Sequence, residues 1–317
     1  MPATPHGVRG AVITGWGTAL GPKTVTNHDL EKTLDTSHEW IVERSGIVER
    51  HVGGSTVQMS IESGRKAIDM AGVDPATIDA LVLATTTPDR AVPASSAAVQ
   101  QELGLRCGAF DVNAACSGFV YGLVQAHGLI AMGARKVLLI GTDTLSRITD
   151  WTDRNTAVLF GDGSGAVVLE AVDGPGQLLG WDLDADGSAE RFLYCDHNAY
   201  IQMEGKEVFR RAVRIMVDSA TKSMQHAGVT ADQVALVVPH QANIRIIQAA
   251  CERLGIPMEK ASTVMHYTGN TSSASIPLAL VDAIDHGKVQ RGDIVLLVGF
   301  GAGMTAASSI IRWGGGA

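Results

Sequence analysis

The feature that most constrains the fold is an internal repeat, in which a helix end, a turn and a buried strand occur twice. Ala-Gly-Val-Asp at 71–74 precedes the apolar run 78–83, and Ala-Gly-Val-Thr at 227–230 precedes the run 234–238. A glycine suits the end of a helix, and a run of apolar and β-branched residues suits a strand covered on both faces. The second copy begins 156 residues after the first, at 227 against 71. This pattern predicts two related βα halves.

Two further pairs of segments repeat in the same order. The runs 136–141 and 293–299 are apolar and their final glycines, 141 and 299, are 158 residues apart. Phe-Gly-Asp-Gly at 160–163 and Phe-Gly-Ala-Gly at 300–303 are only 140 residues apart, so the first half carries an extra segment of about 18 residues at 142–159. Chance recurrence is the alternative, but three pairs in one order favour duplication.

Duplication predicts an α/β architecture with a boundary near residue 170, which divides the chain into halves 1–170 and 171–317. Near-continuous apolar strands are buried on both faces, so two mixed sheets should pack back to back, with helices between and outside them. A chain of 317 residues with 45% hydrophobic composition can form two closely fused cores.

Composition disfavours several classes of function. The formal net charge of −8 gives no general attraction to nucleic acid or an anionic membrane. Apolar runs such as 137–140 and 294–298 are far shorter than the ~20 residues of a membrane-spanning helix, so we expect no membrane insertion. The four cysteines form no CxxC pair or metal-ligand spacing, and the first residues do not resemble a signal peptide. We therefore expect reduced thiols, no metal and a cytoplasmic protein.

Cys116 is the candidate nucleophile. Residues 110–119 begin as a strand, turn on small residues and enter the apolar stretch 120–132, which places Cys116 at the start of a helix. The helix dipole and free backbone N–H groups there favour a thiolate, so we expect a pKa below the usual ~8.5. A lone cysteine is more often inert core packing. We expect that of the other three cysteines, Cys107, Cys195 and Cys251.

His240 and Asn270 are its candidate partners. A nucleophilic cysteine needs a base or hydrogen-bonding group that the fold brings close to it. His240 follows the repeated strand at its carboxyl end, where α/β sheets assemble their sites, although a lone histidine is usually structural. Asn270 lies in the run of small polar residues 266–277, which by itself indicates a solvated loop.

The segments around these three residues closely resemble the Cys-His-Asn site of the β-ketoacyl-acyl-carrier-protein synthase III family, which belongs to the thiolase-fold condensing enzymes. Thiolases resemble Cys-His-Cys and elongating synthases Cys-His-His, so Asn270 indicates the initiating branch. The larger plant-type polyketide synthases also fit, but 317 residues is short for them. The resemblance covers nearly the whole chain and implies duplicated halves in five layers (αβαβα). Further similar segments are 39–47, 153–154, 160–163, 203–209 and 299–303.

The resemblance implies a role for each residue. Cys116 would take an acyl group from a coenzyme A thioester, and decarboxylative condensation with malonyl-acyl carrier protein would follow. His240 and Asn270 would hold the malonyl thioester carbonyl, because two neutral donors stabilise the enolate left by loss of CO2. The backbone N–H groups of Cys116 and Ala302 would form the oxyanion hole. Ala302 stands where glycine is common, but a backbone donor survives that change. Coenzyme A thioester enters as substrate, and no cofactor is required.

The resemblance also implies binding surfaces. Coenzyme A needs an aromatic face and arginines for its adenine and phosphates. Exposed arginines on helices in an otherwise acidic protein would dock an acidic carrier protein, although solvated helix charge is an equal alternative. The implied coenzyme A residues are Trp40, Arg44, Arg154, Gly205 and Asn243, and the implied docking residues are Arg210, Arg214, Arg245 and Arg253.

The implied acyl pocket contains Val92 and Phe300, and the implied assembly is a homodimer. Straight-chain members carry a phenylalanine before Pro93 that closes the pocket across the dimer interface. Because Val92 is smaller, we expect tolerance of branched or medium-length primers.

Three alternatives remain. A Cys-His-Asn acyltransferase or ester-forming relative would pass the acyl group to oxygen or nitrogen without decarboxylation, so CO2 release separates it from a condensing enzyme. A specialised-metabolite ketosynthase III-like enzyme would also condense, but for a different pathway. A non-catalytic synthase subunit typically lacks the reactive cysteine, which is present here as Cys116. A dinucleotide-binding dehydrogenase is disfavoured, because a strand pattern rather than a helix follows the glycines of 299–303.

Overall fold

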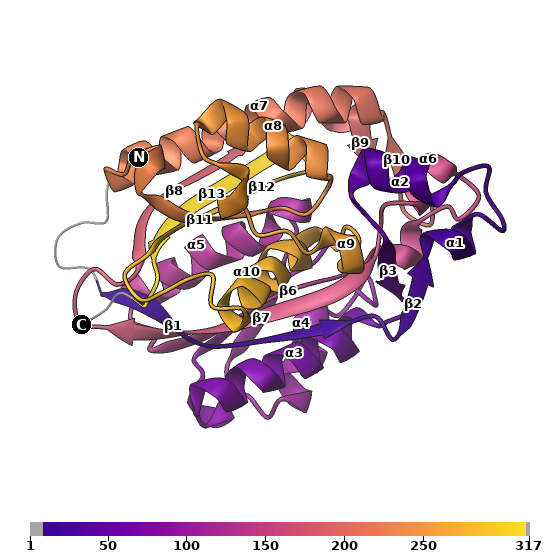
Figure 1. Ribbon diagram of the computed structural model, residues 1–317. Helices are drawn as coiled ribbons and strands as arrows, with labels where there is room; N and C mark the ends of the chain where they lie inside the picture. Colours follow the sequence, from indigo (N-terminus) through magenta and orange to yellow (C-terminus); the bar gives the residue numbers. More distant parts are fainter. Residues whose placement is uncertain (1–8, 315–317) are drawn as a thin grey trace.

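The computed structural model describes residues 9–314 (Figure 1). The N-terminal half is built on a mixed five-stranded sheet in the order β1-β7-β6-β4-β5. β4 pairs parallel with β5 and β6, whereas β7 pairs antiparallel with β6 and β1. The strands are β1 (Gly10–Leu20), β4 (Ala80–Ala84), β5 (Gly108–Val112), β6 (Lys136–Thr144) and β7 (Asp162–Val172).

The C-terminal half is built on a mixed four-stranded sheet in the order β11-β12-β13-β8. β11 pairs parallel with β12, and β13 pairs antiparallel with both β12 and β8. This is the pairing pattern of the first sheet without a counterpart of β5. The strands are β8 (Leu178–Ala185), β11 (Val234–Pro239), β12 (Ile294–Gly301) and β13 (Thr305–Arg312).

The internal repeat is confirmed at the level of single turns. The helices before β4 and β11, namely α3 (Thr56–Ala71) and α7 (Gly205–Ala227), end at Gly72 and Gly228. Both glycines have a left-handed φ of 64°, a conformation that glycine adopts without a steric penalty. Between β6 and β7 lie residues 145–161, but between β12 and β13 only 302–304, so the predicted extra segment is also present.

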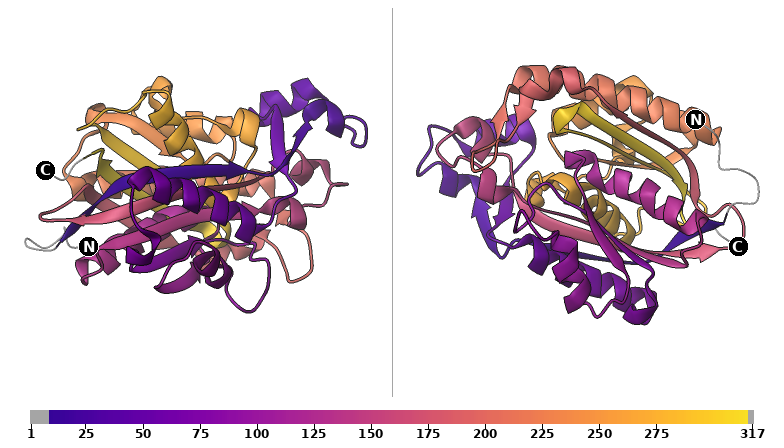
Figure 2. Two further views of the ribbon diagram at one scale, coloured as in Figure 1. Left: turned by 90° about the horizontal axis from the view of Figure 1, so that it is seen from below. Right: turned by 180° about the vertical axis from the view of Figure 1, so that it is seen from behind.

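The elements stack in five layers, as predicted. α5 and α10 lie between the two sheets and share one apolar core with both, which includes Leu123, Leu139, Ile276 and Leu297. α3 and α4 cover the outer face of the first sheet, and α7 and α8 cover that of the second. Figure 2 shows the same layering from behind. The helix bounds are α4 (Ser95–Glu102), α5 (Gly118–Ala131), α8 (Ile244–Leu254) and α10 (Ser275–Asp285).

Burial on both faces explains why the strands are apolar without interruption. In β4, Val82 faces the central layer, whereas Leu81 and Leu83 pack under α3 and α4. In β12, Leu297 faces the central layer and Leu296 packs under the outer helices. A strand with alternating polar residues would place polar groups in one of these dry layers.

Shorter elements gather at one end of the sheets (Figure 1). Part of this group packs on α8 through an apolar cluster that includes Ile41, Ile47, Val158 and Ile247. The cluster fixes these segments against α8. The elements are α1 (Asn27–Leu30), α2 (His38–Ser45), α6 (Arg154–Ala157), α9 (Met265–Thr268), β2 (Lys23–Thr26), β3 (Glu49–Val52), β9 (Leu193–Tyr194) and β10 (Gln202–Met203).

The division into halves at residue 170 falls inside β7, which continues to Val172. Both halves contribute to one central core. The division into two halves therefore stays a prediction. The ends of the two predicted halves, 1–8 and 315–317, lie outside the described residues. Within 9–314, no helix combines the length and the apolar character needed to cross a bilayer.

Candidate active site

Cys116 lies in a tight turn between a strand and a helix. A short 3-10 helix, Ala115–Ser117, connects the end of β5 with α5, and Ala115 has a positive φ of 48°. Gly301 of the opposite sheet approaches this turn so closely that a Cβ on it would lie 2.6 Å from the Cys116 backbone nitrogen. The end of β12 in the second half therefore packs directly against the cysteine turn of the first.

The expected low pKa of Cys116 is wrong. Burial raises the pKa of the thiol to about 12, with a smaller lowering from a side-chain hydrogen bond with Ser272 and a further increase from the negative charge of Asp143. The residue keeps partial exposure. The sequence argument considered the start of α5 but not the surrounding protein, which removes water from the thiolate. The Cys116 side chain is therefore a neutral thiol at ordinary pH.

One turn of the second half contacts all three candidate residues. A Cβ on Gly299 would lie 3.5 Å from the Cys116 carbonyl oxygen and 3.6 Å from His240 Cβ. Ser272, which lowers the pKa of the Cys116 thiol, donates its backbone N–H to Asn270 Oδ1 at 3.0 Å. The hydroxyl oxygen of Ser275 lies 2.6 Å from His240 Nδ1. The turn 270–275 therefore gathers a cysteine of the first half with a histidine and an asparagine of the second.

The hydrogen bonds of His240 indicate its tautomer. The Ser275 hydroxyl accepts the Gln241 backbone N–H at 3.3 Å and still has a proton to donate to His240 Nδ1, which is the arrangement that we assign. Nε2 then carries the ring proton. Burial lowers the pKa of His240 to about 3, so the ring is neutral at ordinary pH. The edge of its ring packs against Phe300 at a centroid distance of 5.4 Å.

The central part of 266–277 is not the solvated loop that its polar pattern alone would indicate. Asn270 is 6% exposed, and residues 271–275 are buried. The hydroxyls of this segment bond to catalytic candidates and to Asp143 instead of to water. Sequence reasoning missed Ser272, Ser275 and Asp143. The density of serines directly before an apolar helix was the available signal.

Four of the five residues implied for coenzyme A lie together. Trp40 on α2 has the Arg44 guanidinium 4.5 Å and the Arg154 guanidinium 5.1 Å from its ring centroid. Asn243, the N-cap of α8, donates to the Arg44 carbonyl at 2.7 Å. Gly205 is not part of these contacts and lies at the exposed start of α7. Trp40 is partly exposed, so it presents an aromatic face beside two cations.

The other implied positions differ in their surroundings. Val92 is 82% exposed, in the loop between β4 and α4. Phe300 packs with Val298 in the core beneath α7 and α8 and touches His240. Ala302 directly follows Gly301, which faces the Cys116 backbone nitrogen.

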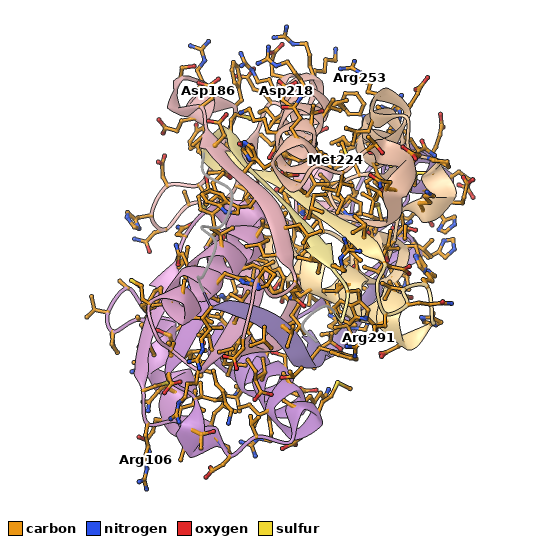
Figure 3. The ribbon with its side chains drawn as sticks, turned by 90° about the vertical axis from the view of Figure 1, so that its left-hand side faces the viewer. Arg106, Asp186, Asp218, Met224, Arg253 and Arg291 are labelled. Carbon is orange, nitrogen blue, oxygen red and sulfur yellow. The ribbon has the colours of Figure 1, made fainter. Side chains whose placement is uncertain are left out.

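The implied docking arginines are exposed on two packed helices. Arg210 and Arg214 belong to α7, and Arg245 and Arg253 to α8. Arg210 pairs with Glu207 at 2.6 Å, whereas within residues 9–314 no carboxylate lies at ion-pair distance from the other three. The same outer layer also presents Asp218 (Figure 3), so this surface carries both signs of charge.

The remaining cysteines only partly follow the prediction of core packing. Cys251 is buried and Cys107 is partly buried, but Cys195 is exposed, so the prediction is wrong for Cys195. In the described part of the chain, no group of three or more His, Cys, Asp or Glu side chains could hold a metal ion.

Comparison with known proteins places this arrangement in a family. The model of 3-oxoacyl-[acyl-carrier-protein] synthase III matches residues 110–187, and the model of its C-terminal part matches 224–313. The β-ketoacyl-[acyl-carrier-protein] synthase III 1 of Bacillus anthracis is 47% identical over 95% of this chain and 98% of its own length. The chain belongs to the β-ketoacyl-acyl-carrier-protein synthase III family.

Solved structures agree with this assignment. The 3-oxoacyl-[acyl-carrier-protein] synthase III of Aquifex aeolicus superposes with a TM-score of 0.94 at 43% identity, over 96% of this chain and 100% of that one. The priming β-ketosynthase of the R1128 polyketide biosynthetic pathway gives 0.92 at 35% identity, over 97% of both chains. As a family member with the thiolase-like fold, the protein is a condensing enzyme of the acyltransferase class.

Proposed function

We propose that this enzyme loads an acyl group from coenzyme A onto Cys116 and condenses it with the malonyl group of malonyl-acyl carrier protein, with release of CO2. The observation that carries this proposal is the convergence of Cys116, His240 and Asn270 on the single buried turn 270–275. The names of its relatives supply the acyl carrier protein as the expected partner.

In the first half-reaction, the Cys116 sulfur attacks the acyl-CoA carbonyl as its proton leaves. A carbon–sulfur bond forms to Cys116, the bond to coenzyme A breaks, and the departing sulfur gains the proton. The Cys116 and Ala302 backbone N–H groups stabilise the oxyanion formed in between. The support for this pair is the close packing of Gly301, the neighbour of Ala302, on the cysteine turn.

In the second half-reaction, the malonyl carboxylate leaves as CO2 and its electron pair forms an enolate. His240 donates through Nε2–H, because Nδ1 is occupied by Ser275. Asn270 donates through its Nδ2 group, because its Oδ1 is held by the Ser272 N–H. The enolate carbon attacks the acyl-Cys116 carbonyl, and the cysteine sulfur leaves as a thiolate that takes up a proton from water to restore the thiol. Two neutral donors favour this step because the charge moves from the carboxylate to the thioester oxygen, beside the donors, only as the bond to CO2 breaks.

We infer the substrate and partner surfaces from their chemistry. Trp40 with Arg44, Arg154 and Asn243 suits the adenine and phosphates of coenzyme A, and Gly205 at the start of α7 is the fifth residue that we assign to this ligand. The exposed docking arginines suit an acidic carrier protein. Val92 and the open edge of β5 suit a homodimer contact, in which Val92 of one chain would reach the acyl pocket of the other. A cytoplasmic location and a role in fatty acid synthesis follow from this chemistry.

The test measures the two half-reactions separately. Intact mass after incubation with straight and branched acyl-CoAs should show one acyl adduct, absent in Cys116→Ala and retained in the matched control Cys195→Ala. Carboxyl-labelled malonyl-acyl carrier protein should release labelled CO2, and Asn270→Ala should lower that release about 100-fold while the adduct still forms. An adduct on another residue, or turnover without CO2, would contradict the proposal. The second outcome would favour transfer to an oxygen or nitrogen acceptor.

A further inference from the structure

Asp143 is a fully buried carboxylate at the centre of the molecule. It lies near the end of β6, and within residues 9–314 no Lys, Arg or His lies at ion-pair distance from it. A buried carboxylate without a cation is costly unless hydrogen bonds replace its water shell. The hydrogen-bond donors that surround Asp143 therefore show which segments of the chain it holds together.

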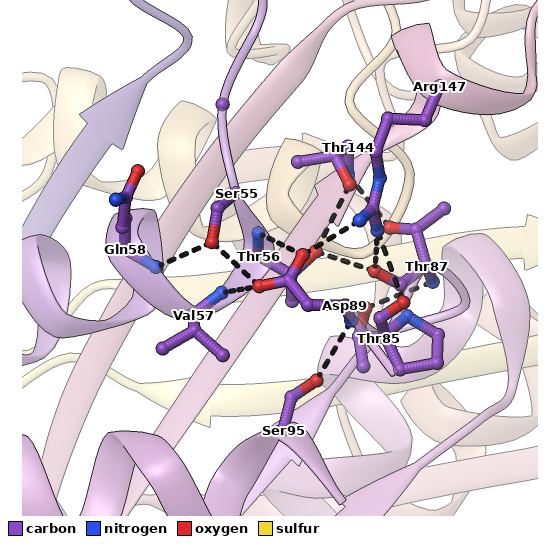
Figure 4. Close-up of polar contacts among 12 residues, drawn as sticks. Ser55, Thr56, Val57, Gln58, Thr85, Thr87, Asp89, Ser95, Thr144 and Arg147 are labelled. Carbon is purple, nitrogen blue, oxygen red and sulfur yellow. Dashed lines mark hydrogen bonds and ion pairs between the residues drawn. The ribbon is translucent and has the colours of Figure 1, made fainter. Parts of the chain in front are cut away.

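One oxygen of Asp143 binds the loop that follows β4. Oδ1 accepts the Thr86 backbone N–H at 2.7 Å, and the hydroxyls of Thr85 and Thr87 at 3.1 and 2.9 Å. The same loop is anchored on its other side by Asp89, which pairs with Arg147 at 2.8 Å (Figure 4). These threonines thus hold the carboxylate from a fixed segment of the N-terminal half.

The other oxygen binds the C-terminal half. Oδ2 accepts the Ser273 backbone N–H at 3.0 Å and the Ser273 hydroxyl at 2.7 Å. The turn is pressed against β6 at this point, since a Cβ on Gly141 would lie 2.6 Å from the Ser273 carbonyl oxygen. Asp143 therefore links segments 130 residues apart across the boundary between the halves.

Ser273 directly follows Ser272, the residue that interacts with both Cys116 and Asn270. Ser272 acts on the Cys116 thiol and donates to Asn270 Oδ1, and it adopts a positive φ of 51°. A non-glycine residue keeps such a conformation only where its surroundings hold it. The two bonds from Ser273 to Asp143 supply that constraint one residue away.

We propose that Asp143 is a positioning residue that sets the distance between the Asn270 amide and the acyl group on Cys116. It acts through the 272–274 turn and touches neither substrate. This inference deepens the proposed function and rests on it. It predicts that loss of Asp143 affects decarboxylation and condensation, which use Asn270, far more than acyl loading, which does not.

The variant Asp143→Asn tests this with almost no change in volume. Its amide nitrogen accepts no hydrogen bond, so either the Ser273 turn or the loop of Thr85 and Thr87 loses its acceptor, and we expect the turn to shift. We expect CO2 release to fall on the order of 10- to 100-fold, with acyl loading within about threefold of the parent. Because the negative charge of Asp143 contributes to the high pKa of Cys116, the variant should also react faster with iodoacetamide at a fixed pH.

Two further variants complete the test. Asp111→Asn is the matched control, since Asp111 accepts the Ser95 and Ser96 N–H groups at the start of α4, and both half-reactions should stay within about twofold of the parent. Ser273→Ala removes one donor and should show the same split as Asp143→Asn, only smaller. It decides the question if Asp143→Asn fails to fold. Equal loss of both half-reactions in these variants, or loss of neither, overturns the positioning role. Absence of CO2 release by the parent enzyme would instead overturn the proposed function.

Discussion

Cys116 and His240 are a neutral pair at rest. Burial raises the pKa of the thiol to about 12 and lowers that of the imidazole to about 3. An ion pair at this depth would lose hydration on both partners. The neutral imidazole is also the form that suits enolate stabilisation, since Nε2–H is a donor that gains strength as charge develops on the substrate.

The raised pKa of Cys116 predicts its alkylation profile. Only the thiolate reacts with iodoacetamide, so the rate should increase about tenfold for each pH unit and still be increasing at pH 10. Glutathione in the same tube, with an ordinary thiol pKa, should level off above about pH 9. Intact mass against time gives both rates, and Cys116→Ser identifies the site. A plateau below pH 8 would show that the helix dipole outweighs burial.

At the scale of elements, the candidate site lies where the carboxyl ends of three strands meet. The end of β5 leads into the cysteine turn, the end of β11 leads into His240, and the end of β12 passes Gly301. The carboxyl ends of the parallel pairs in each sheet thus supply the site, as is usual in α/β folds. The cysteine turn and the 272–274 turn are each approached closely by a glycine, Gly301 and Gly141 respectively, where a side chain would not fit.

Substitution of Gly301 tests this dependence. In Gly301→Ala the new Cβ would lie 2.6 Å from the Cys116 nitrogen and 2.9 Å from Ala115 Cβ, so the cysteine turn must move. We expect acyl loading to fall about 100-fold, since small displacements of reacting groups have effects of that size. Loading is measured by intact mass after rapid quenching.

Gly128→Ala provides the matched control. Gly128 lies on α5 with open space around its Cβ position, so alanine there should stabilise the protein by about 0.5–1 kcal/mol. Acyl loading should be unchanged. Normal loading in Gly301→Ala would mean that the contact between β12 and the cysteine turn does not position the nucleophile.

At the scale of the whole molecule, the two halves share one core. α5 of the first half and α10 of the second lie side by side between the sheets, and residues of both sheets pack on them. Each half alone would expose the inner face of its sheet and one side of its central helix. We therefore expect that the two halves are not separate folding units.

We expect the fragments 1–170 and 171–317, expressed separately, to lack a cooperative thermal transition. The intact chain should unfold in one step, because opening either half exposes the shared core. Circular dichroism and calorimetry measure both. A cooperative transition in either fragment alone would contradict the shared-core argument and would support the division at residue 170 as a true domain boundary.

The sequence by itself determined the repeat, the layered α/β fold and the turn that carries Cys116. These features depend on neighbouring residues, such as the glycines that end α3 and α7 and the apolar runs of β4 and β12. The choice of His240 and Asn270 needed the family resemblance as well, because neither stands out from its local pattern.

Only the tertiary structure decided that the serine-rich turn is buried, that the thiol is neutral and that Asp143 joins the halves. The physical reason is that desolvation and hydrogen-bond partners are set by segments more than 100 residues apart in the chain. A polar run has the same local pattern whether it faces water or a buried carboxylate, so its role depends on what the fold packs against it.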